Sequence, residues 1–443
     1  MTETTAANGR PRIVIVGGGF GGFFSALRLE RRRDEGPAPH VTLISDANAL
    51  LYTPFLPQAA GGTLEPRHVT TPLRGPLRST EILVGRAVAH DAARRTVEFA
   101  SASDERRTLH YDHLVLSPGS SSRMLPVPGL AEAAVGFKTL AEAIHLRNTA
   151  LQMLELANTT SDPDERAAQL TFVFVGGGYA GVEALAELED LLREARRLYP
   201  SLRDQPFRWV LVEATESLLP EVGTRLSAYV MRQLHDRGIE LRLGTRVREV
   251  SDGVVTLDTG ERLPARTVVL TAGVRAHPTV AAMGLPVDDA GRVRVDDTLA
   301  VDGLPGVWAL GDAAAVPDPA RPGLTCPPTS QHVTKQARLV ADNVLASIAG
   351  RPSEPFRYRT RGLFVDLGRY KAVASVAGLQ FSGLPAWFMA RSYHLSQIPG
   401  FTRKARVATD WTVGILFDRD LSELGSLGHP EPLDPQGGQH GRD

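Results

Sequence analysis

The sequence contains a single cysteine, Cys326, among its 443 residues. One thiol excludes an intramolecular disulfide and a Cys-x-x-Cys redox pair, and with them the chemistry of disulfide reductases. No stretch approaches the roughly 18 consecutive apolar residues of a membrane-spanning helix. Residues 1–10 also lack the apolar run of a signal peptide. We therefore expect the body of the protein in the cytoplasm, touching a membrane at most from one side.

An excess of positive charge is also missing, since 49 Lys and Arg residues stand against 50 Asp and Glu residues. A nucleic-acid-binding protein usually has a strong basic excess, so we expect no nucleic-acid partner. No His and Cys residues are spaced as metal ligands, so we expect no metal. The hydrophobic share of 42% is typical of a soluble globular protein, and the length predicts two or three domains.

A glycine-rich loop follows the first predicted strand. The strand is the β-branched run at residues 12–16, and the loop fits G-x-G-x-x-G at Gly17, Gly19 and Gly22, with a helix predicted over residues 23–33. The glycines allow a tight turn and a close approach to a pyrophosphate, which the N-terminus of the helix attracts. The strand before the loop and the helix after it indicate a dinucleotide site.

The acid that usually binds the ribose of this first dinucleotide is missing from its expected place. After the predicted strand at residues 41–44, Asp or Glu is expected at position 45, but the sequence has Ser45 and then Asp46. Three alternatives remain open: Ser45 binds the ribose, Asp46 turns toward it, or Asp46 is a solvated turn residue.

The same motif occurs a second time, after a polar segment at 162–166 that we interpret as a linker. In this second copy, a strand is predicted at residues 171–175 and the glycine loop at 176–181. A helix at residues 182–199 and another strand at 209–212 follow. The loop has its glycines at Gly176, Gly178 and Gly181, and the last strand ends at Glu213. A carboxylate there accepts hydrogen bonds from a ribose diol and repels a 2′-phosphate, so NADH is favoured over NADPH. Two loops predict two dinucleotides, and a flavin with a nicotinamide is the economical pair.

A third signal comes after both loops. A meander of three strands is predicted at residues 246–250, 254–258 and 266–270, and a further strand at 307–310 leads into Gly311-Asp312. An aspartate at the end of such a strand can reach the ribityl chain of a flavin. Gly-Asp is common, and its position after both loops is what makes it informative.

These patterns predict an α/β protein with two Rossmann-like dinucleotide-binding domains, one for FAD and one for NADH, followed by a C-terminal region. That this is a membrane-associating region is implied by the family resemblance given next. We predict an FAD-binding domain at residues 1–125 and 275–350, with an NADH-binding domain inserted at residues 126–274. A C-terminal membrane or dimer region is predicted at residues 351–424, and a disordered tail at residues 425–443.

The sequence resembles the type II NADH dehydrogenases, single-chain flavoenzymes that pass electrons from NADH to a membrane quinone. The resemblance extends from about residue 12 to residue 424. Besides the two glycine loops, it rests on Leu51-Tyr52-Thr53-Pro54-Phe55-Leu56-Pro57-Gln58, Tyr111-Asp112-His113-Leu114-Val115-Leu116-Ser117-Pro118-Gly119, Thr271-Ala272-Gly273-Val274, Gly311-Asp312 and Pro327-Pro328-Thr329-Ser330-Gln331-His332.

The resemblance implies which residues bind the two dinucleotides. For FAD they are Gly17, Gly19, Phe20, Gly22, Ser45, Asp46, Pro54, Val88, Gly119, Gly311 and Asp312. For NADH they are Gly176, Gly178, Tyr179, Gly181, Glu213 and Gly273.

The resemblance also implies a catalytic set. Glu183 is expected near the nicotinamide and the quinone, and Gln331 is expected to line the quinone pocket. From the residues alone, Glu183 is equally a first-turn carboxylate favoured by the helix dipole. Lys335 departs from the family, which often has Gln at that place. We expect Lys335 to pair with an acid such as Glu183, or to favour a different acceptor.

The C-terminal region has an apolar stripe at Val407, Trp411 and Ile415, next to aromatic residues and to basic residues at 403–406. Such a stripe suits a helix that lies on an anionic membrane surface. The alternative is that it packs on the protein or on a second subunit, as in a homodimer. The resemblance favours peripheral attachment to the cytoplasmic side of the cell membrane.

We therefore expect hydride transfer from NADH to FAD, followed by transfer of two electrons to a membrane quinone, without proton pumping. The flavin supplies the chemistry and the protein supplies position and charge. Two alternatives remain: an NAD(P)H-flavin reductase with a soluble acceptor, similar to ferredoxin reductases, and a non-catalytic flavin-based NADH sensor. A sulfide:quinone oxidoreductase is disfavoured, since Cys326 stands alone.

Overall fold

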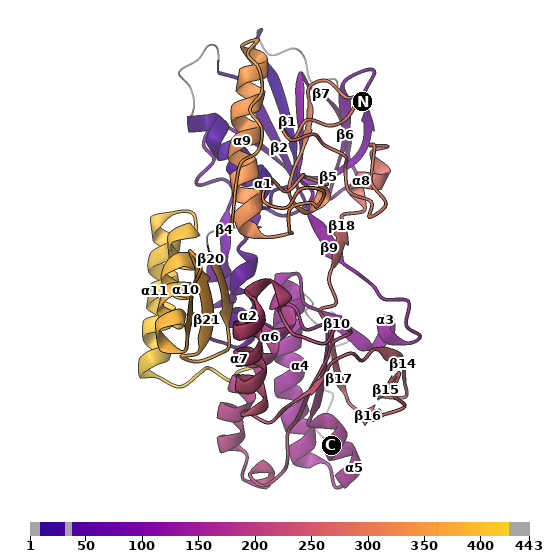
Figure 1. The fold of residues 1–443 in the computed structure, drawn as a ribbon, viewed down its shortest axis with the longest axis vertical. Helices are drawn as coiled ribbons and strands as arrows, with labels where there is room; N and C mark the ends of the chain where they lie inside the picture. The colour runs from indigo at the N-terminus through magenta and orange to yellow at the C-terminus, as the bar shows by residue number, and fades with distance from the viewer. Residues whose placement is uncertain (1–8, 32–37, 361, 425–443) are drawn as a thin grey trace, which may run out of the picture.

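The structure is a computed structural model that describes residues 9–31, 38–360 and 362–424. The predicted disordered tail at 425–443, and the end of the helix predicted over 23–33, lie outside the described residues. Two sheets with parallel strands form the two ends of the molecule, and the C-terminal region lies at one side between them (Figure 1).

The first sheet combines the start of the chain with a strand from beyond residue 300. Its order is β19 (Val307–Ala309), β8 (His113–Leu116), β1 (Arg12–Val16), β2 (His40–Ser45), β5 (Glu81–Asp91), β6 (Thr96–Ser101) and β7 (Arg106–His110). The first five strands are parallel, and β6 and β7 add an antiparallel edge. The central strands are buried, as expected for strands covered on both faces.

Two helices that are distant in the sequence lie side by side on this sheet, α1 (Phe20–Arg31) and α9 (Ser330–Ile348) (Figure 1). Arg28 of α1 and Asp342 of α9 form an ion pair at 2.9 Å between Nη2 and Oδ2. The buried hydroxyl of Ser25 donates to the carbonyl of Ala337. These contacts place the start of α9 beside the first glycine loop.

The second sheet holds the second copy of the motif, and all of its strands are parallel. Its order is β10 (Ala134–Gly136), β17 (Thr267–Leu270), β11 (Thr171–Val175), β12 (Arg208–Val212) and β13 (Ile239–Arg242). The helices of this half are α4 (Leu140–Thr159), α6 (Tyr179–Ala195) and α7 (Thr224–His235). On α6, Leu185, Leu188, Leu191 and Leu192 are fully buried and pack in the core of this half.

Two sequence interpretations are wrong in this half. The predicted linker at 162–166 is the start of a helix, α5 (Pro163–Gln169), because the Asp162 side chain accepts from the N–H groups of Asp164 and Glu165. The third strand predicted for the meander is β17 of the parallel sheet. The meander consists of β14 (Val247–Ser251), β15 (Val254–Leu257) and β16 (Arg262–Pro264).

Short elements join the two sheets. Strands β9 (Ser120–Ser122) and β18 (Val274–Ala276) pair antiparallel where the chain crosses between them (Figure 1). The remaining short elements are β3 (Ala49–Leu51), α2 (Leu56–Ala60), β4 (Thr70–Pro72), α3 (Leu130–Ala133) and α8 (Thr279–Ala282).

The C-terminal region is an antiparallel sheet with two helices. Its strands and helices are β20 (Gly362–Asp366), β21 (Ala372–Val376), β22 (Leu379–Ser382), α10 (Leu384–Gln397) and α11 (Phe401–Leu416). Both helices lie at the outer edge of the molecule (Figure 1). No helix in the described part of the chain is long and apolar enough to cross a membrane.

Candidate active site between the two glycine loops

The first glycine loop has a distinct requirement at each of its three glycines. Gly17 has a φ of +105°, which favours glycine. A Cβ on Gly22 would lie 1.8 Å from the Gly17 carbonyl oxygen, so only glycine lets α1 start this close to the loop. A Cβ on Gly19 would meet no atom within 4 Å. The space in front of Gly19 is therefore open to a ligand, as the middle glycine of a pyrophosphate loop requires.

The second loop repeats this geometry. Gly176 has a φ of +115°, and a Cβ on Gly181 would lie 2.0 Å from the Gly176 carbonyl oxygen. A Cβ on Gly178, which precedes α6, would meet nothing within 4 Å. Both loops thus combine a strained turn, an open middle position and a tightly packed helix start, and both fit a dinucleotide.

The residues after β2 separate the alternatives for the missing acid. Ser45 is 3% exposed and lies against the loop, because a Cβ on Gly18 would come within 2.2 Å of its Oγ. The Ser45 hydroxyl donates to the carbonyl of Ala47 at 2.6 Å. Asp46 is exposed. Ser45 is therefore the residue that the fold holds next to the first loop.

Glu213 is held at the matching position of the second loop. Its Oε2 accepts from the N–H of Gly177 at 2.7 Å. Its Oε1 accepts from the N–H and the hydroxyl of Thr215 at 2.8 and 2.9 Å. Three donors fix the carboxylate beside the loop, where it would face the ribose of a bound nucleotide.

A cavity of about 970 Å³ lies between the two halves of the molecule. It brings together nine of the residues predicted from the sequence: Pro54, Gly176, Gly178, Tyr179, Glu183, Glu213, Gly273, Asp312 and Gln331. We call it the main cavity.

Other predicted residues lie elsewhere. Lys335 lines a second cavity. Val88 is half-buried in β5, beside an irregularity between Ala87 and Ala89, and lines neither cavity. Gly119 has a φ of +75° just after β8, and a Cβ there would meet nothing within 4 Å.

Asp312 is held by a lysine that the sequence patterns did not reveal. The hydroxyl of Ser120 donates to the Asp312 carboxylate at 2.6 Å, and Lys138 Nζ lies 3.6 Å from the same oxygen. Lys138 also lines the main cavity, at the start of α4. Gly311 has a φ of +73° and donates its N–H to the side chain of Gln336 at 2.9 Å. These contacts orient the carboxylate toward the cavity.

Glu183 lies half-buried in the wall of the main cavity, in the first turns of α6. Its Oε1 accepts from the backbone N–H of Asp366 at 2.9 Å. Burial raises the pKa of Glu183 well above its usual range, and the nearby Asp366 and Glu187 raise it further. Burial, with Glu187 beside it, likewise raises the pKa of Asp366 to about 7. Burial therefore favours the protonated form of Glu183.

The two residues of the expected ion pair line different cavities. Glu183 lines the main cavity and accepts a hydrogen bond from Asp366 of β20, whereas Lys335 lines the second cavity. The Lys335 ammonium lies 6.0 Å from the centroid of the Tyr358 ring. The two charges thus belong to different cavities.

This second cavity, of about 180 Å³, lies between α1, α9 and α10; we call it the aromatic cavity. Its aromatic side chains are Phe20, Phe24, Tyr52, Tyr358 and Tyr393.

The two cavities share the first two residues of α9, Ser330 and Gln331. The Gln331 amide donates to the carbonyl of Gly362 at 2.9 Å, and its oxygen accepts from the Tyr358 hydroxyl at 3.2 Å. Gln331 is therefore fixed at the wall between the cavities.

His394 is a second residue without a sequence signal. It lines the main cavity, and its Nδ1 lies 3.1 Å from the hydroxyl of Tyr52, which lines the aromatic cavity. Burial lowers the pKa of His394 to about 4, so its imidazole is neutral at neutral pH. His394 comes from α10, more than three hundred residues from Tyr52, and no local motif marks it.

Of the C-terminal stripe predicted for the membrane, Val407 and Trp411 pack on the protein. Val407 is fully buried, and the indole N–H of Trp411 donates to the side chain of Gln58 at 2.9 Å. Only Ile415 of the three is exposed. The exposed apolar residues of the two helices are Leu384, Phe388, Phe401, Val413, Ile415 and Leu416, followed directly by Phe417.

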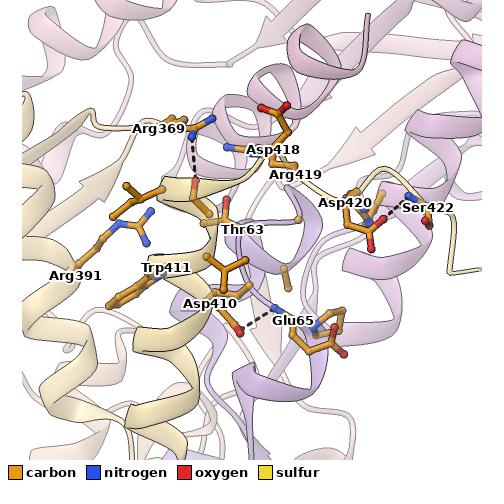
Figure 2. A pocket seen from close by; sticks show the side chains of 18 of the residues that line it. Thr63, Glu65, Arg369, Arg391, Asp410, Trp411, Asp418, Arg419, Asp420 and Ser422 are labelled. Carbon is orange, nitrogen blue, oxygen red and sulfur yellow. Dashed lines mark hydrogen bonds between the residues drawn. The ribbon is translucent and has the colours of Figure 1, made fainter. Parts of the chain in front are cut away.

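Beneath these helices is a third cavity, of about 270 Å³, shown in Figure 2. The guanidinium of Arg391 lies over the rings of Trp387 and Trp411, at 4.2 and 4.7 Å from their centroids. Asp410 accepts from the N–H of Glu65 at 3.1 Å. These contacts fasten α10 and α11 to the residues that follow α2. No metal-ligating cluster of three side chains occurs in the described ranges.

Comparison with known proteins agrees with this geometry. The chain matches the pyridine nucleotide-disulphide oxidoreductase family over residues 11–338. It is 31% identical over 425 residues to a type II NADH:quinone oxidoreductase of Mycobacterium tuberculosis, covering 93% of this chain and 89% of that protein. It is 30% identical to the demethylphylloquinone reductase of Synechocystis, covering 92% of this chain and 97% of that protein.

Solved structures show the same fold. The NDH2 structure from Plasmodium falciparum in complex with NADH has a TM-score of 0.84 at 18% identity, and the match covers 93% of this chain and 100% of that chain. With the match to the family profile and the relative at 31% identity, this chain belongs to the type II NADH:quinone oxidoreductases within the pyridine nucleotide-disulphide oxidoreductase family.

Proposed function

We propose that the protein transfers hydride from NADH to FAD and then two electrons to a membrane quinone, without proton pumping. One observation carries this proposal. The main cavity, which contains the second glycine loop, and the aromatic cavity meet at Ser330 and Gln331. A donor and an acceptor can therefore reach the same place from two sides.

We assign NADH to the second loop and FAD to the first. On the NADH side, Gly178 leaves room for the pyrophosphate and Glu213 faces the ribose. On the FAD side, Gly19 leaves room for the pyrophosphate and Asp312 faces the ribityl chain. When bound, FAD supplies the two-electron carrier between donor and acceptor. The FAD domain would then comprise residues 1–125 and 275–350, and the NADH domain residues 126–274.

The reaction consumes a proton, because NADH, a quinone and one proton give NAD⁺ and a quinol. We assign the delivery of that proton to Glu183, which lies in the wall of the main cavity and whose protonated form is favoured by burial, since burial raises its pKa. Asp366, with a pKa of about 7, can exchange a proton at the same pH. Gln331, between the cavities, would orient the carbonyl oxygen of the quinone.

We further propose that the protein is peripheral on the cytoplasmic side of the cell membrane. The exposed apolar residues of α10 and α11 would enter the interface; of the predicted 407/411/415 stripe only Ile415 is among them. A homodimer contact on the same surface is the competing explanation.

A steady-state assay of the FAD-loaded protein tests the central proposal. NADH should support rapid reduction of quinones, and NADPH should be a poor donor. A soluble-acceptor reductase would reduce ferricyanide or a ferredoxin but no quinone. A sensor would be bleached by NADH without rapid turnover with any acceptor. Either of these two results would contradict the proposed activity.

A further inference from the structure

The aromatic cavity has walls suited to a flat ring. The Phe20 ring lies 5.5 Å from that of Tyr52 and 6.4 Å from that of Phe24, measured between centroids. On the opposite side, Tyr393 is stacked on Phe364 at 4.9 Å and so is held in place. Aromatic walls of this kind favour planar aromatic ligands.

The charges at this cavity all have one sign. Lys335 and Arg338 line it, three residues apart and so on one face of α9. No acidic side chain is among the described residues that line it. Lys335 and Arg338 are both exposed, so they form a positive rim at the mouth of the cavity.

The remaining polar groups are uncharged donors and acceptors. They are Tyr52, Ser330, Gln331, Thr334, Tyr358, Tyr393 and Gln397. Burial raises the pKa of Tyr393 to about 12, so its phenol is neutral at neutral pH.

Resting on the quinone-reducing function proposed above, we propose that the aromatic cavity favours quinones that carry a negative charge, and that Lys335 and Arg338 provide this preference. A 2-hydroxynaphthoquinone is such an acceptor, because its hydroxyl is a vinylogous acid that is ionised at neutral pH. Its flat ring suits the aromatic walls, and its anionic oxygen suits the positive rim.

The reaction with such an acceptor is balanced. NADH gives up a hydride, which carries two electrons and one proton, and becomes NAD⁺. The two carbonyl oxygens of the acceptor take two electrons and two protons, the second proton coming from solvent. The ionised ring oxygen takes up a further proton from solvent, because in the reduced ring it is an ordinary phenol and no longer a vinylogous acid. The quinol product is therefore neutral at neutral pH.

The experiment compares 2-hydroxy-1,4-naphthoquinone with its neutral methyl ether, 2-methoxy-1,4-naphthoquinone. Dissociation constants are measured by calorimetry on the oxidised, FAD-loaded protein, and KM values by steady-state assay with NADH. Lys335→Gln should weaken binding of the anion about threefold, as expected for one exposed charge pair, and leave the methyl ether unchanged. Lys335→Arg, which keeps the charge, should behave as wild type.

Two further measurements sharpen the test. Arg338→Gln combined with Lys335→Gln should weaken anion binding further, and high salt should reduce the wild-type preference while leaving the double variant unaffected. Both residues are exposed, so neither change should disturb folding.

The outcomes separate this inference from the proposed function. If wild type and the double variant show the same affinity ratio for the two quinones, the charge preference is wrong while quinone reduction stands. If NADH reduces the flavin but neither quinone is turned over, the proposed function itself fails.

Discussion

At the scale of single residues, the environment of a side chain decides its role more than its type does. Glu213 and Glu183 are both carboxylates near the second glycine loop. Glu213 accepts three hydrogen bonds that suit a charged group, whereas Glu183 accepts one and burial favours its protonated form. One acid therefore serves recognition, and the other can hold a proton.

Glu213 should set the preference for NADH. In Glu213→Gln the charge that repels a 2′-phosphate is lost, so the kcat/KM for NADPH relative to NADH should rise about tenfold. Glu216→Gln is the matched control, because Glu216 is exposed nearby but does not line the main cavity. Steady-state kinetics with both donors measure the ratio. A wild-type preference for NADPH would overturn the assignment.

His394 should make stability depend on pH. Its folded pKa of about 4 lies below its usual value of 6.5, so between these pH values the unfolded chain binds a proton that the folded chain does not. Stability should therefore fall as pH decreases from 6.5 to 4, by up to about 3 kcal/mol.

His394→Gln removes this titration and keeps a partner for Tyr52. The difference in unfolding free energy between the variant and wild type, from urea titrations at several pH values, isolates the His394 contribution. Its sign should favour the variant increasingly toward pH 4. A difference that does not change with pH would contradict the neutral, buried imidazole.

At the scale of elements, the two loop-and-helix units show how far local sequence determines structure. Strand, glycine loop and helix were predicted at both places, since turn sterics and the start of a helix involve residues within a few positions of each other. The wrong interpretations also have local reasons. The segment at 162–166 is polar, but Asp162 followed by Pro163 is a helix start. The run at 266–270 directly follows the strands of the meander in the sequence, which suggests that it belongs to them. Its residues in β17 are all buried, as in a central strand of a parallel sheet.

Replacing the middle glycine of the first loop should weaken FAD binding, whereas replacing the last glycine should destabilise the fold. Gly19→Ala adds a methyl group to open space, so the protein should fold but bind FAD at least about tenfold more weakly. Gly22→Ala places a Cβ 1.8 Å from the Gly17 carbonyl oxygen and should destabilise the domain itself. Gly178→Ala should leave FAD bound and weaken only NADH.

Flavin absorbance per polypeptide and circular dichroism distinguish these cases. A Gly19→Ala protein with full flavin content would show that the open space in front of the first loop is not the pyrophosphate site.

At the scale of the whole molecule, helix α10 completes both cavities. Tyr393 and Gln397 line the aromatic cavity and His394 lines the main cavity, all from α10. Helices α10 and α11 lie at the outer edge of the molecule (Figure 1), and both have exposed apolar side chains. If this surface contacts a membrane, the aromatic cavity lies next to the bilayer. A quinone dissolved in the bilayer could then enter the cavity directly.

Membrane attachment should depend on that exposed surface. Leu416→Glu with Phe417→Glu should lower flotation with anionic vesicles severalfold, because charge replaces apolar burial. Leu198→Glu is the matched control, since Leu198 is 71% exposed and Leu416 is 70% exposed. Unchanged flotation together with a halved mass by light scattering would favour the homodimer contact instead.

Local sequence patterns were enough to predict the two glycine loops, the parallel sheets that carry them, the place of Glu213 after its strand and the family, because each depends on short motifs of neighbouring residues. The tertiary structure was needed to show that Glu183 and Lys335 line different cavities and that Val407 faces inward. It also brought Lys138 to Asp312 and His394 to Tyr52. These are contacts between distant segments, and they depend on how helices and sheets pack, which no local pattern of residues encodes.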